Sequence, residues 1–539
     1  MKRGERLTSE KPLVRIRRKR KESKKSSTAE EILEMKQDEE NRSVYELKES
    51  IQSSFGQTAD LIMESLKIAE TDGMLFYLST VIDNNQLQQT LMNKQTYQSN
   101  SSFDLKSKEG IKEFCEQLFG GSGFKFVYTL EEVSKEILNG SLAIAFKTFP
   151  SYITIAMPNS NLRQVSEPTS QTVIRGPKDS FVELASINMA LVRRRIRNPN
   201  LRFEEFIIGN ETQTKVFLGY MNSIANEKIV EEVRKRLNSI NVSAIFESGN
   251  IEELIVDKTF TVFPLAFNTE RPDTVAGQLM EGKICIIIDG TPFALLVPAV
   301  FTDFFISSED YYHHYSISSF LRLLRYVSFM IVLIVPSAYV GILTYHQELV
   351  PTHLLINIMA QREGVPFPAV VEVLIMELTF EILREAGIRM PRAVGQTVSI
   401  VGALVIGQAA AEAGIISNIM VIIVAITATA NFVAPVYSLS AATRILRLIL
   451  IPIAGFLGLY GVLLGLVVMV AHLASLRSFG VPYLAPIAPF NSEDQRDVFI
   501  RFPYWGMTRR PSYLRTAQPV KQKNKGSNTP PDMQRRNDG

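Results

Sequence analysis

The sequence has 539 residues, which is enough for several domains, and its formal net charge at neutral pH is +3. A net charge this small points to no particular class of charged partner. Hydrophobic residues make up 46% of the chain, but charged residues are dense before Arg325 and sparse from there to Arg477. Two cysteines, Cys115 and Cys285, suit a reducing compartment without a disulfide framework. No apolar run of suitable length follows Met1, so we expect no secretory signal.

Basic residues crowd the first part of the chain. Residues 1–44 include LVRIRRKRKESKK and few apolar residues, so we expect a disordered basic tail there. Such a tail can bind nucleic acid or anionic lipid. The apolar stretches further along the chain favour a solvated tail that fixes membrane orientation, and we predict no nucleic-acid partner.

Two α/β subdomains are predicted next. In residues 45–160, ADLIMESLKIAE is typical of a helix, MLFYLSTVI of a buried strand, and LNGSLAIAFKTFPSYITIAMP of two strands around a turn. Residues 161–315 contain the strand patterns TKVFLGYM, KICIIIDG and TPFALLVPAVF and the helical pattern EKIVEEVRKRLNSI. The glycine-rich GGSGF lacks the Lys-Ser/Thr of a phosphate loop, so we interpret it as a turn.

An arginine run lies early in the second subdomain, within ALVRRRIRNPN. Its guanidinium groups could bind phosphate or acidic lipid, but such runs are more often salt-bridged helix faces near a membrane. We predict that three of these residues contact the membrane or a neighbouring subunit, namely Arg193, Arg194 and Arg195.

Residues 316–490 are predicted to form a helical membrane domain of four to six membrane segments. Four stretches approach the length of about 20 apolar residues that a bilayer requires. They are Tyr326–Gln347, Ala393–Ala411, Ala413–Thr443 and Leu448–Leu476. In the last stretch, the spacing of Gly461 and Gly465 allows close helix packing. The aromatic residues of FTDFFISSEDYYHHYS, just before the first stretch, suit an interfacial belt.

Basic residues beside these stretches predict how the chain is oriented in the membrane. Arg322 and Arg325 precede the first stretch, and several arginines follow the last, so we expect both chain termini in the cytosol. Four full spans satisfy this expectation, but four arginines would then lie outside, against the positive-inside rule. They are Arg389, Arg392, Arg444 and Arg447.

An unusual helix is predicted at residues 366–387, within the sequence VPFPAVVEVLIMELTFEILREAG that begins at Val365. At about 100° per residue, one narrow sector holds four charged residues, and Glu372 falls nearly opposite them. The four are Glu377, Glu381, Arg384 and Glu385. Because a carboxylate in hydrocarbon is costly, these groups should face water, a partner or a protein interior. Three interpretations stay open: an amphipathic helix at the membrane surface, a helix lining an aqueous path or subunit interface, and a soluble core helix.

The end of the chain, residues 491–539, is predicted to be a basic tail. RFPYWGMTRRPSYLR places Trp505 among arginines, and KQKNKGSNTPPDMQRRNDG has the composition of a disordered segment. Before it, FGVPYLAPIAPF is expected to run along the membrane surface. No Ser/His/Asp order, HExxH helix, CxxC pair or Walker loop is present, so we predict no catalytic residue, no metal site, no cofactor and no enzyme activity.

Long segments of the chain resemble the A subunit of the GerA-type nutrient germinant receptors of spore-forming bacteria. They are EPTSQTVIRGPKDSFVELASINMALVRRRIRNPNL, DGTPFALLVPAVFTDFFISSEDYY, VPFPAVVEVLIMELTFEILREAGIRMPRAVGQTVSIVGALVIGQAAAEAGIIS and SFGVPYLAPIAPF. The resemblance implies an α/β soluble N-terminal region of two cytosolic subdomains and an α-helical polytopic membrane domain. It also implies assembly in the spore inner membrane with a permease-like B subunit, which binds nutrients, and a lipoprotein C subunit. The A subunits would oligomerise into a nutrient-gated ion channel that triggers germination by cation release.

This resemblance sharpens the interpretation of the charged helix. We predict that Glu377 and Glu381, four residues apart, line a water-filled path where A subunits meet, with Glu372, Arg384, Glu385 and Asn431 as further candidates for the path or the subunit interface. In the alternative, Arg384 neutralises the two carboxylates in a local ion pair. An alternative function is a stand-alone secondary transporter, which helices broken by Gly and Pro would suit, although no inverted repeat is visible.

Overall fold

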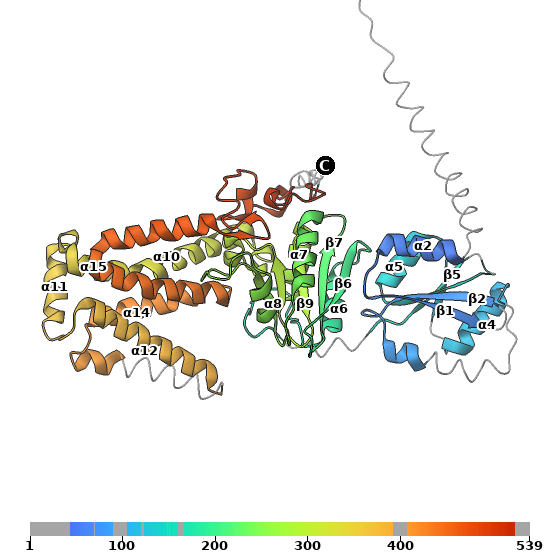
Figure 1. Cartoon of the computed structure of the whole chain (residues 1–539), viewed down its shortest axis with the longest axis horizontal. Helices are drawn as coiled ribbons and strands as arrows, with labels where there is room; N and C mark the ends of the chain where they lie inside the picture. Colours follow the sequence, from blue (N-terminus) through green and yellow to red (C-terminus); the bar gives the residue numbers. More distant parts are fainter. Residues whose placement is uncertain are drawn as a thin grey trace, which may run out of the picture. The chain divides into compact units, whose positions relative to one another are not determined.

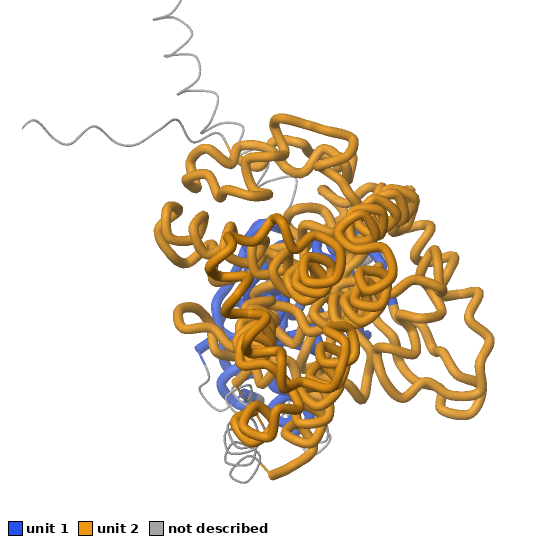
Figure 2. The backbone as a smooth tube through the Cα atoms, turned by 90° about the vertical axis from the view of Figure 1, so that its left-hand side faces the viewer, with its two compact units in different colours: residues 1–164, 189–204 blue, residues 165–188, 205–539 orange. Residues whose placement is uncertain are grey.

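The computed structural model describes most of the chain, in two compact units. The described residues are 44–68, 71–89, 105–119, 123–147, 149, 151–159, 167–391 and 407–522. The first unit contains residues 1–164 and 189–204, and the second contains residues 165–188 and 205–539 (Figure 2). Nearly all of the predicted basic tail and the last part of the chain lie outside the described residues, as does most of the expected span Ala393–Ala411.

The first unit is built on a five-stranded sheet in the order β1-β2-β4-β5-β3 (Figure 1). Each neighbouring pair of strands is antiparallel. The strands are β1 Leu61–Ile68, β2 Thr71–Leu78, β3 Phe124–Val127, β4 Ser141–Phe146 and β5 Tyr152–Ala156. The helices are α2 Val44–Phe55, α4 Lys108–Phe119 and α5 Leu130–Leu138.

Helices cover both faces of this sheet, and this arrangement explains one wrong prediction. Leu66 of β1 belongs to the core that α4 covers, whereas Leu61 of the same strand belongs to the core that α2 and α5 cover. A strand that is buried on both faces shows no clean alternation of apolar and polar residues. The helix predicted for residues 59–70 is therefore wrong, and the segment forms strand β1.

A second five-stranded sheet has the order β6-β7-β9-β10-β8, which repeats the strand order of the first sheet. Its strands are β6 Leu201–Ile208, β7 Thr214–Met221, β8 Phe267–Thr269, β9 Ile284–Ile288 and β10 Ala294–Val297. Its helices are α6 Ala185–Arg195, α7 Glu227–Ser239, α8 Ser248–Ile255 and α9 Pro272–Glu281. The chain thus has the two α/β regions that the sequence predicts.

The chain next forms two 3-10 helices, η2 Phe301–Phe305 and η3 Ser308–Tyr311. The phenylalanines here are not the interfacial belt that the sequence predicts. Phe301, Phe304 and Phe305 are at most 8% exposed and pack against Tyr483 and the start of the following helix. Their large apolar area stabilises the junction between the second sheet and the first long apolar helix.

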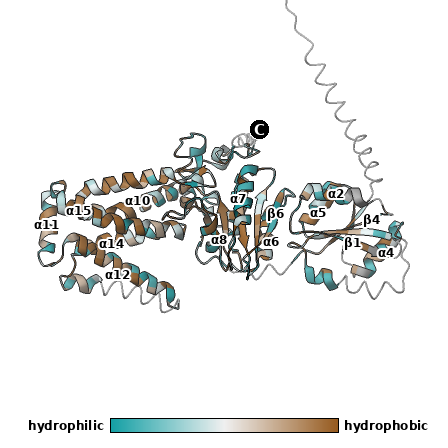
Figure 3. Cartoon of the chain, viewed as in Figure 1, coloured by the Kyte–Doolittle hydropathy of each residue, from teal (hydrophilic) through white to brown (hydrophobic). Residues whose placement is uncertain are grey.

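The apolar part of the chain forms a group of helices, on which the hydrophobic residues are concentrated (Figure 3). They are α10 Tyr315–Tyr345, η4 Gln347–Leu349, α11 Thr352–Arg362, α12 Ala369–Arg389, α14 Asn418–Asn431 and α15 Tyr437–Ser475. Within the described residues, α10 and α15 are long and apolar enough to cross a membrane. The expected span Ala413–Thr443 is not one helix, because the chain leaves helical geometry between α14 and α15.

Helix α15 turns back on itself at Gly458, whose φ of 63° and ψ of −152° lie in a region that only glycine adopts readily. A methyl group added at Gly465 would collide with the side chain of Leu450. In a straight helix these two positions would be about 22 Å apart along the axis. The two arms of α15 therefore pack against each other, and Gly461, which is buried, lies at the same contact.

The turn of α15 packs closely on the end of α10. A methyl group added at Gly341 would stand 2.9 Å from the backbone nitrogen of Leu459. One added at Gly458 would stand 2.8 Å from the His346 ring. Two glycines thus let the backbones of α10 and α15 approach each other directly.

The chain after α15, residues 477–522, is here called the C-terminal segment. It contains β11 Arg477–Ser478, β12 Val481–Pro482 and the 3-10 helices η5 Asp494–Asp497, η6 Tyr504–Gly506 and η7 Ser512–Leu514. Phe479, Val481 and Ala485 join the core of the second sheet together with α7 and α8. The structure thus folds residues 491–522 onto the second sheet, in the stretch for which the sequence suggests a tail.

Candidate functional site

Helix α12 carries the predicted carboxylates. It begins after Pro368, at a position where a missing N–H costs nothing, and its residues up to Glu377 include a buried face. Glu372 and Glu377 are both fully buried, although helical geometry places them on different sides. Both can be buried because α12 packs against α10, α14 and α15.

Glu377 and Glu381 form ion pairs with two arginines of α15. Arg447 Nη2 lies 2.5 Å from Glu377 Oε2 and 3.5 Å from Glu381 Oε1. Arg444 Nη1 donates to Glu381 Oε2 at 2.7 Å. The Arg447 side chain is 2% exposed, whereas those of Glu381 and Arg444 are 21% and 15% exposed. We call these four residues the charge cluster.

Arg384 lies beside the charge cluster without forming the local ion pair that the sequence suggests. Its guanidinium carbon stands 5.7 Å from the ring centres of both Phe432 and Tyr437. Its buried Nη1 has no hydrogen-bond partner within the described residues. Two carboxylates are thus surrounded by three guanidinium groups, so this part of the chain carries a net positive charge.

Glu372 forms a separate set of contacts on another side of α12. Its Oε1 accepts hydrogen bonds from the backbone N–H and the hydroxyl of Ser417, at 2.6 Å and 2.5 Å. Ser417 is the residue before α14, so the carboxylate lies at the positive end of that helix, where it is stabilised. Arg362 Nε stands 3.5 Å from Glu372 Oε2. These contacts join α12 to α14 and α11.

The two remaining candidates on these helices are placed differently. Glu385 pairs with Arg389 one turn later at 2.6 Å, and both side chains are more than half exposed. Such a pair contributes little to stability. Asn431 is buried, and its Oδ1 accepts a hydrogen bond of 2.7 Å from Ser440. It lines a cavity of about 20 Å³ together with Arg325, which is room for one water molecule.

The predicted arginine run divides into different roles. Arg193 is 1% exposed, and its Nε and Nη2 donate to the two oxygens of Asp60 at 2.8 Å each. Burial alone would raise the pKa of Asp60, but the charge and hydrogen bonds of Arg193, with those of Thr58 and Thr80, hold that pKa below its usual value. Arg193 therefore holds the first unit together.

The rest of the run is more accessible. Arg194 is exposed, and Arg195 is partly exposed and donates to the Leu191 carbonyl of its own helix at 3.1 Å. A contact of this stretch with lipid or a neighbouring subunit stays a prediction, and these two side chains are the ones available for it.

A second buried charge network lies where α10 begins, and the sequence does not point to it. Asp310 Oδ2 pairs with Arg325 Nη1 at 2.7 Å and with Arg322 Nη2 at 3.3 Å. Arg322 Nη1 also reaches Asp497 Oδ1 of the C-terminal segment at 2.8 Å. Both arginines that predict membrane orientation therefore hold Asp310 of η3, and Arg322 also fixes α10 to the C-terminal segment.

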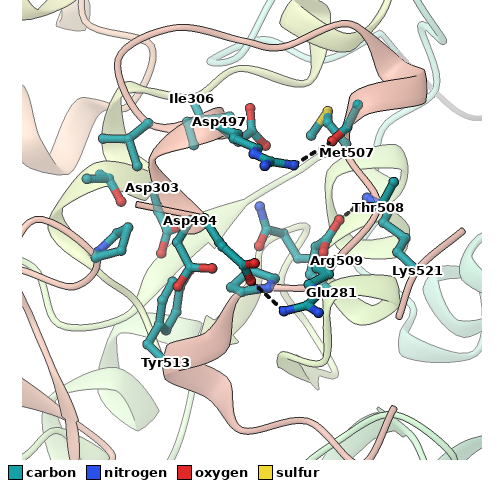
Figure 4. A pocket seen from close by; sticks show the side chains of 18 of the residues that line it. Glu281, Asp303, Ile306, Asp494, Asp497, Met507, Thr508, Arg509, Tyr513 and Lys521 are labelled. Carbon is teal, nitrogen blue, oxygen red and sulfur yellow. Dashed lines mark hydrogen bonds and ion pairs between the residues drawn. The ribbon is translucent and has the colours of Figure 1, made fainter. Parts of the chain in front are cut away.

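A cavity of about 310 Å³ lies between α9, η2, η3 and the C-terminal segment (Figure 4). Five carboxylates line it: Glu281, Asp303, Glu493, Asp494 and Asp497. Four of them form ion pairs within the chain, with Lys521, Lys283, Arg509 and Arg322. Burial and the nearby Asp497 carboxylate raise the pKa of Tyr311, another lining residue, well above its usual value. Within the described ranges, no group of three or more His, Cys, Asp or Glu side chains could hold a metal ion.

The partners of the predicted carboxylates are what sequence reasoning missed. Arg444 and Arg447 are distant from α12 in the sequence, and no local spacing connects them. A signal was nevertheless present, because under a four-span topology both arginines break the positive-inside rule. A charge in a disallowed place requires a partner, and Glu377 and Glu381 have no basic partner of their own helix in the ion pairs of the described residues, so the two sets of charges could have been matched.

Comparison with known proteins identifies the family. A family model described as Bacillus/Clostridium GerA spore germination protein matches residues 49–513. The chain belongs to the GerA family. It is 43% identical to spore germination protein KA of Bacillus subtilis (strain 168) over 470 residues, which are 87% of this chain and 86% of that protein. It is also 43% identical to spore germination protein GerLA of Bacillus cereus over 388 residues, 72% of this chain and 79% of that protein.

A solved structure also matches this GerA-family chain. It is the N-terminal domain of the A subunit of the Bacillus megaterium spore germinant receptor GerK3, at 32% identity. The match covers 48% of this chain and 96% of that structure, with a TM-score of 0.37. The predicted resemblance to germinant-receptor A subunits is thus confirmed at the level of the family.

Proposed function

We propose that this GerA-family chain is the A subunit of a nutrient-gated ion channel in the spore inner membrane. Several copies would assemble around a water-filled path, together with a permease-like B subunit that binds the nutrient and a lipoprotein C subunit. The family membership and the two long apolar helices support a membrane receptor subunit. Release of cations through the path would then start germination.

The charge cluster carries this proposal. Carboxylates that line a path attract cations and repel anions. In this single chain, Arg444 and Arg447 neutralise Glu381 and Glu377, which suits a resting state without free negative charge along a path. Nutrient binding to the partner subunit would favour a second arrangement, in which Glu381 separates from Arg444 and turns toward the path. Glu381 is the better candidate of the two, because its side chain is 21% exposed and that of Glu377 is fully buried.

Substituting Arg444 and Glu381 one at a time distinguishes this mechanism from a purely structural role of their ion pair. Arg444→Gln removes the shorter of the two ion pairs of Glu381 and leaves only the 3.5 Å contact with Arg447, so spores with this variant should release potassium before any nutrient is added. Glu381→Gln removes the negative charge, so release after nutrient addition should become slower while receptor abundance stays normal. The double variant should release potassium slowly and only with nutrient. The measurement is potassium efflux from spores, with immunoblots of the receptor.

A matched control is Glu385→Gln, which removes an exposed carboxylate of the same helix and should leave efflux unchanged. A structural role for the pair predicts that both single variants lower abundance alike and that neither leaks. Equal loss of abundance in the two variants, without premature release, would contradict the proposal.

The alternative of a stand-alone transporter is tested with the purified chain in liposomes. A channel should pass single-channel currents, and only when the B and C subunits are present with nutrient. A transporter should show saturable uptake of a solute without partners.

Both termini of the proposed subunit lie in the cytosol. Arg20→Cys and Val520→Cys should therefore react with an impermeant thiol reagent only after sealed vesicles are opened. Background labelling should be low, because Cys115 and Cys285 are buried.

A further inference from the structure

Part of the C-terminal segment exposes an unusual number of apolar side chains. Between Phe499 and Trp505 five large apolar or aromatic residues are 40% to 58% exposed: Phe499, Ile500, Phe502, Tyr504 and Trp505. The charged residue among them, Arg501, is instead buried, with its guanidinium over the Tyr311 ring at 5.5 Å. In this segment the charged side chain is thus buried and the aromatic rings are exposed. Exposed clusters of apolar side chains mark interaction sites.

This segment is fixed to the first part of α10. The backbone N–H of Arg501 donates to Ser319 Oγ at 3.1 Å, and its Nη1 donates to the His313 carbonyl at 3.1 Å. The ring of Phe499 lies 4.9 Å from that of Tyr326, where the apolar stretch of α10 begins. The exposed rings therefore lie beside the residues through which α10 enters its apolar part.

The apolar surface continues from the segment onto α10. Five large apolar residues on this helix are 40% to 65% exposed: Phe320, Leu323, Leu324, Val327 and Met330. Met330 lies inside the stretch that is apolar enough to cross a membrane. Exposed apolar residues thus lie both on a candidate membrane-spanning helix and on residues 499–505, which contacts of Ser319 and Tyr326 join to that helix.

We propose that residues 499–505 lie on the surface of the lipid bilayer as an interfacial contact beside α10. A bilayer fits this surface because its headgroup region accepts aromatic rings that are apolar at one end and polar at the other. The continuity with the exposed face of α10 favours lipid over a second copy of the chain. The proposal rests on α10 and α15 being membrane helices, as in the proposed function. It assigns to the C-terminal segment the interfacial belt that the sequence suggests for residues 301–316.

Trp505 is the single tryptophan of the chain, so its fluorescence tests the contact directly. The full chain is reconstituted in nanodiscs of phosphatidylglycerol and phosphatidylcholine, with or without bromine atoms on the acyl chains. Bromine quenches an indole only at close range, so Trp505 should lose emission in brominated nanodiscs. In a variant with Trp505→Phe and Ile500→Trp, bromine should reduce the emission about twofold more. Residue 500 follows Phe499, whose ring contacts Tyr326 at the start of the apolar stretch of α10.

Two further variants, also made with Trp505→Phe, serve as controls. Phe246→Trp places the probe at a 74% exposed position in the loop between α7 and α8, next to Glu247, which contacts the Thr291 turn between β9 and β10. It should emit as a tryptophan in water and stay unquenched. Val467→Trp places the probe at a 58% exposed position of α15 and should be strongly quenched.

The outcomes test the membrane placement of α15 and the interfacial contact of residues 499–505 separately. If the probe at residue 467 is unquenched, the membrane placement of α15 is wrong, and the proposed function fails with it. If that probe is quenched while the probes at residues 500 and 505 behave like the one at 246, the interfacial contact is wrong and the membrane placement stands. Blue-shifted emission at 500 without quenching would show that protein, as in a second copy of the chain, covers the segment, which also overturns the proposal.

Discussion

Two buried arginine–carboxylate pairs differ in how completely their hydrogen bonds are satisfied. In the first unit, both oxygens of Asp60 accept from Arg193, and each also accepts from a threonine hydroxyl, at 2.7 Å and 2.9 Å. In the apolar helices, Glu377 has one short contact with Arg447, and neither of its oxygens has a hydrogen bond of normal geometry within the described residues.

This difference indicates two kinds of role for a buried charge. A carboxylate with four good donors is held in one position, and any change of partner would cost several hydrogen bonds. An arginine held by charge alone can exchange one carboxylate for another, and Arg447 lies 3.5 Å from Glu381 as well as 2.5 Å from Glu377. The first pair is suited to keeping a fold rigid, and the second to a site with two arrangements.

The largest effect is expected from breaking the satisfied pair. Asp60→Asn would leave Arg193 buried without a counter-charge and should lower the free energy of unfolding of the first unit by about 3 to 5 kcal/mol. The measurement is urea denaturation of the chain in detergent, followed by limited proteolysis of the first unit. Glu116→Gln, which removes an exposed pair with Lys112, is the control and should change little. An unchanged midpoint for Asp60→Asn would contradict the role given to this pair.

Breaking the second pair should cost somewhat less. Glu377→Gln leaves Arg447 buried without its nearest carboxylate, but Glu381 stays within reach, so we expect a loss of about 3 kcal/mol and lower abundance in spores. Replacing the pair by apolar residues, with Glu377→Leu and Arg447→Met, should restore abundance. It should not restore nutrient-gated efflux if the pair serves the mechanism. Recovery of both properties in the apolar variant would show that the pair has no functional part.

A smaller loss is expected at the turn of α15, which keeps Arg447 in position. Gly458→Ala would force a side chain into a backbone conformation suited to glycine and against the His346 ring, at a cost of about 1 to 3 kcal/mol. Receptor abundance and melting temperature are the measurements. Gly364→Ala, where an added methyl group meets nothing within 4 Å, is the control. Equal behaviour of the two variants would mean that the turn is not constrained.

The smallest effect concerns Glu252, a carboxylate that forms no ion pair within the part of the chain that the structure describes. Burial, and then the nearby Glu247 charge, raise the pKa of Glu252 on α8 from 4.5 to about 7. Because the folded chain binds this proton more tightly than the unfolded chain, the stabilisation is present below pH 4.5 and is lost as pH rises through about 7. The stability gain of Glu252→Gln relative to the native chain should therefore grow between these limits, reach about 1 to 2 kcal/mol near the middle of the range, and persist above pH 7. The measurement is the free energy of unfolding of both proteins across this pH range. A difference between them that does not change with pH would exclude the raised pKa of Glu252.

Much of the apolar half could be predicted from local pattern. The start of α12 follows from Pro368, and its charged sector follows from helical periodicity, so the predicted helix 366–387 and the observed Ala369–Arg389 nearly coincide. The long apolar helix α10 follows from a run of apolar residues bounded by Arg325 and Glu348. These features depend on residues that are close together in the sequence.

The features that could not be predicted depend on distant residues. Arg193 reaches Asp60, and Arg444 reaches Glu381, across long stretches of chain that no spacing rule connects. The C-terminal segment has the composition of a loop and becomes ordered through contacts such as Arg322 with Asp497. The break between α14 and α15 has only Pro435 as a local signal, and a proline is compatible with a bent continuous helix as well.

In the proposed membrane subunit, the turn at Gly458 would also determine how deep in the bilayer the arginines of α15 lie. The first arm begins near Arg325, since Ser440 and Thr443 share a small cavity with it, and it reaches the far end of α10 at Gly458. The second arm returns, and His472 in its last turn forms a hydrogen bond of 3.0 Å with Thr261, in the loop between α8 and β8. In the proposed subunit each arm would cross the bilayer once, so both ends of α15 would face the side on which α10 starts. Arg447 would then lie within the first arm, about 16 Å along the helix from the turn, at a depth where its charge requires the carboxylates of α12 as partners.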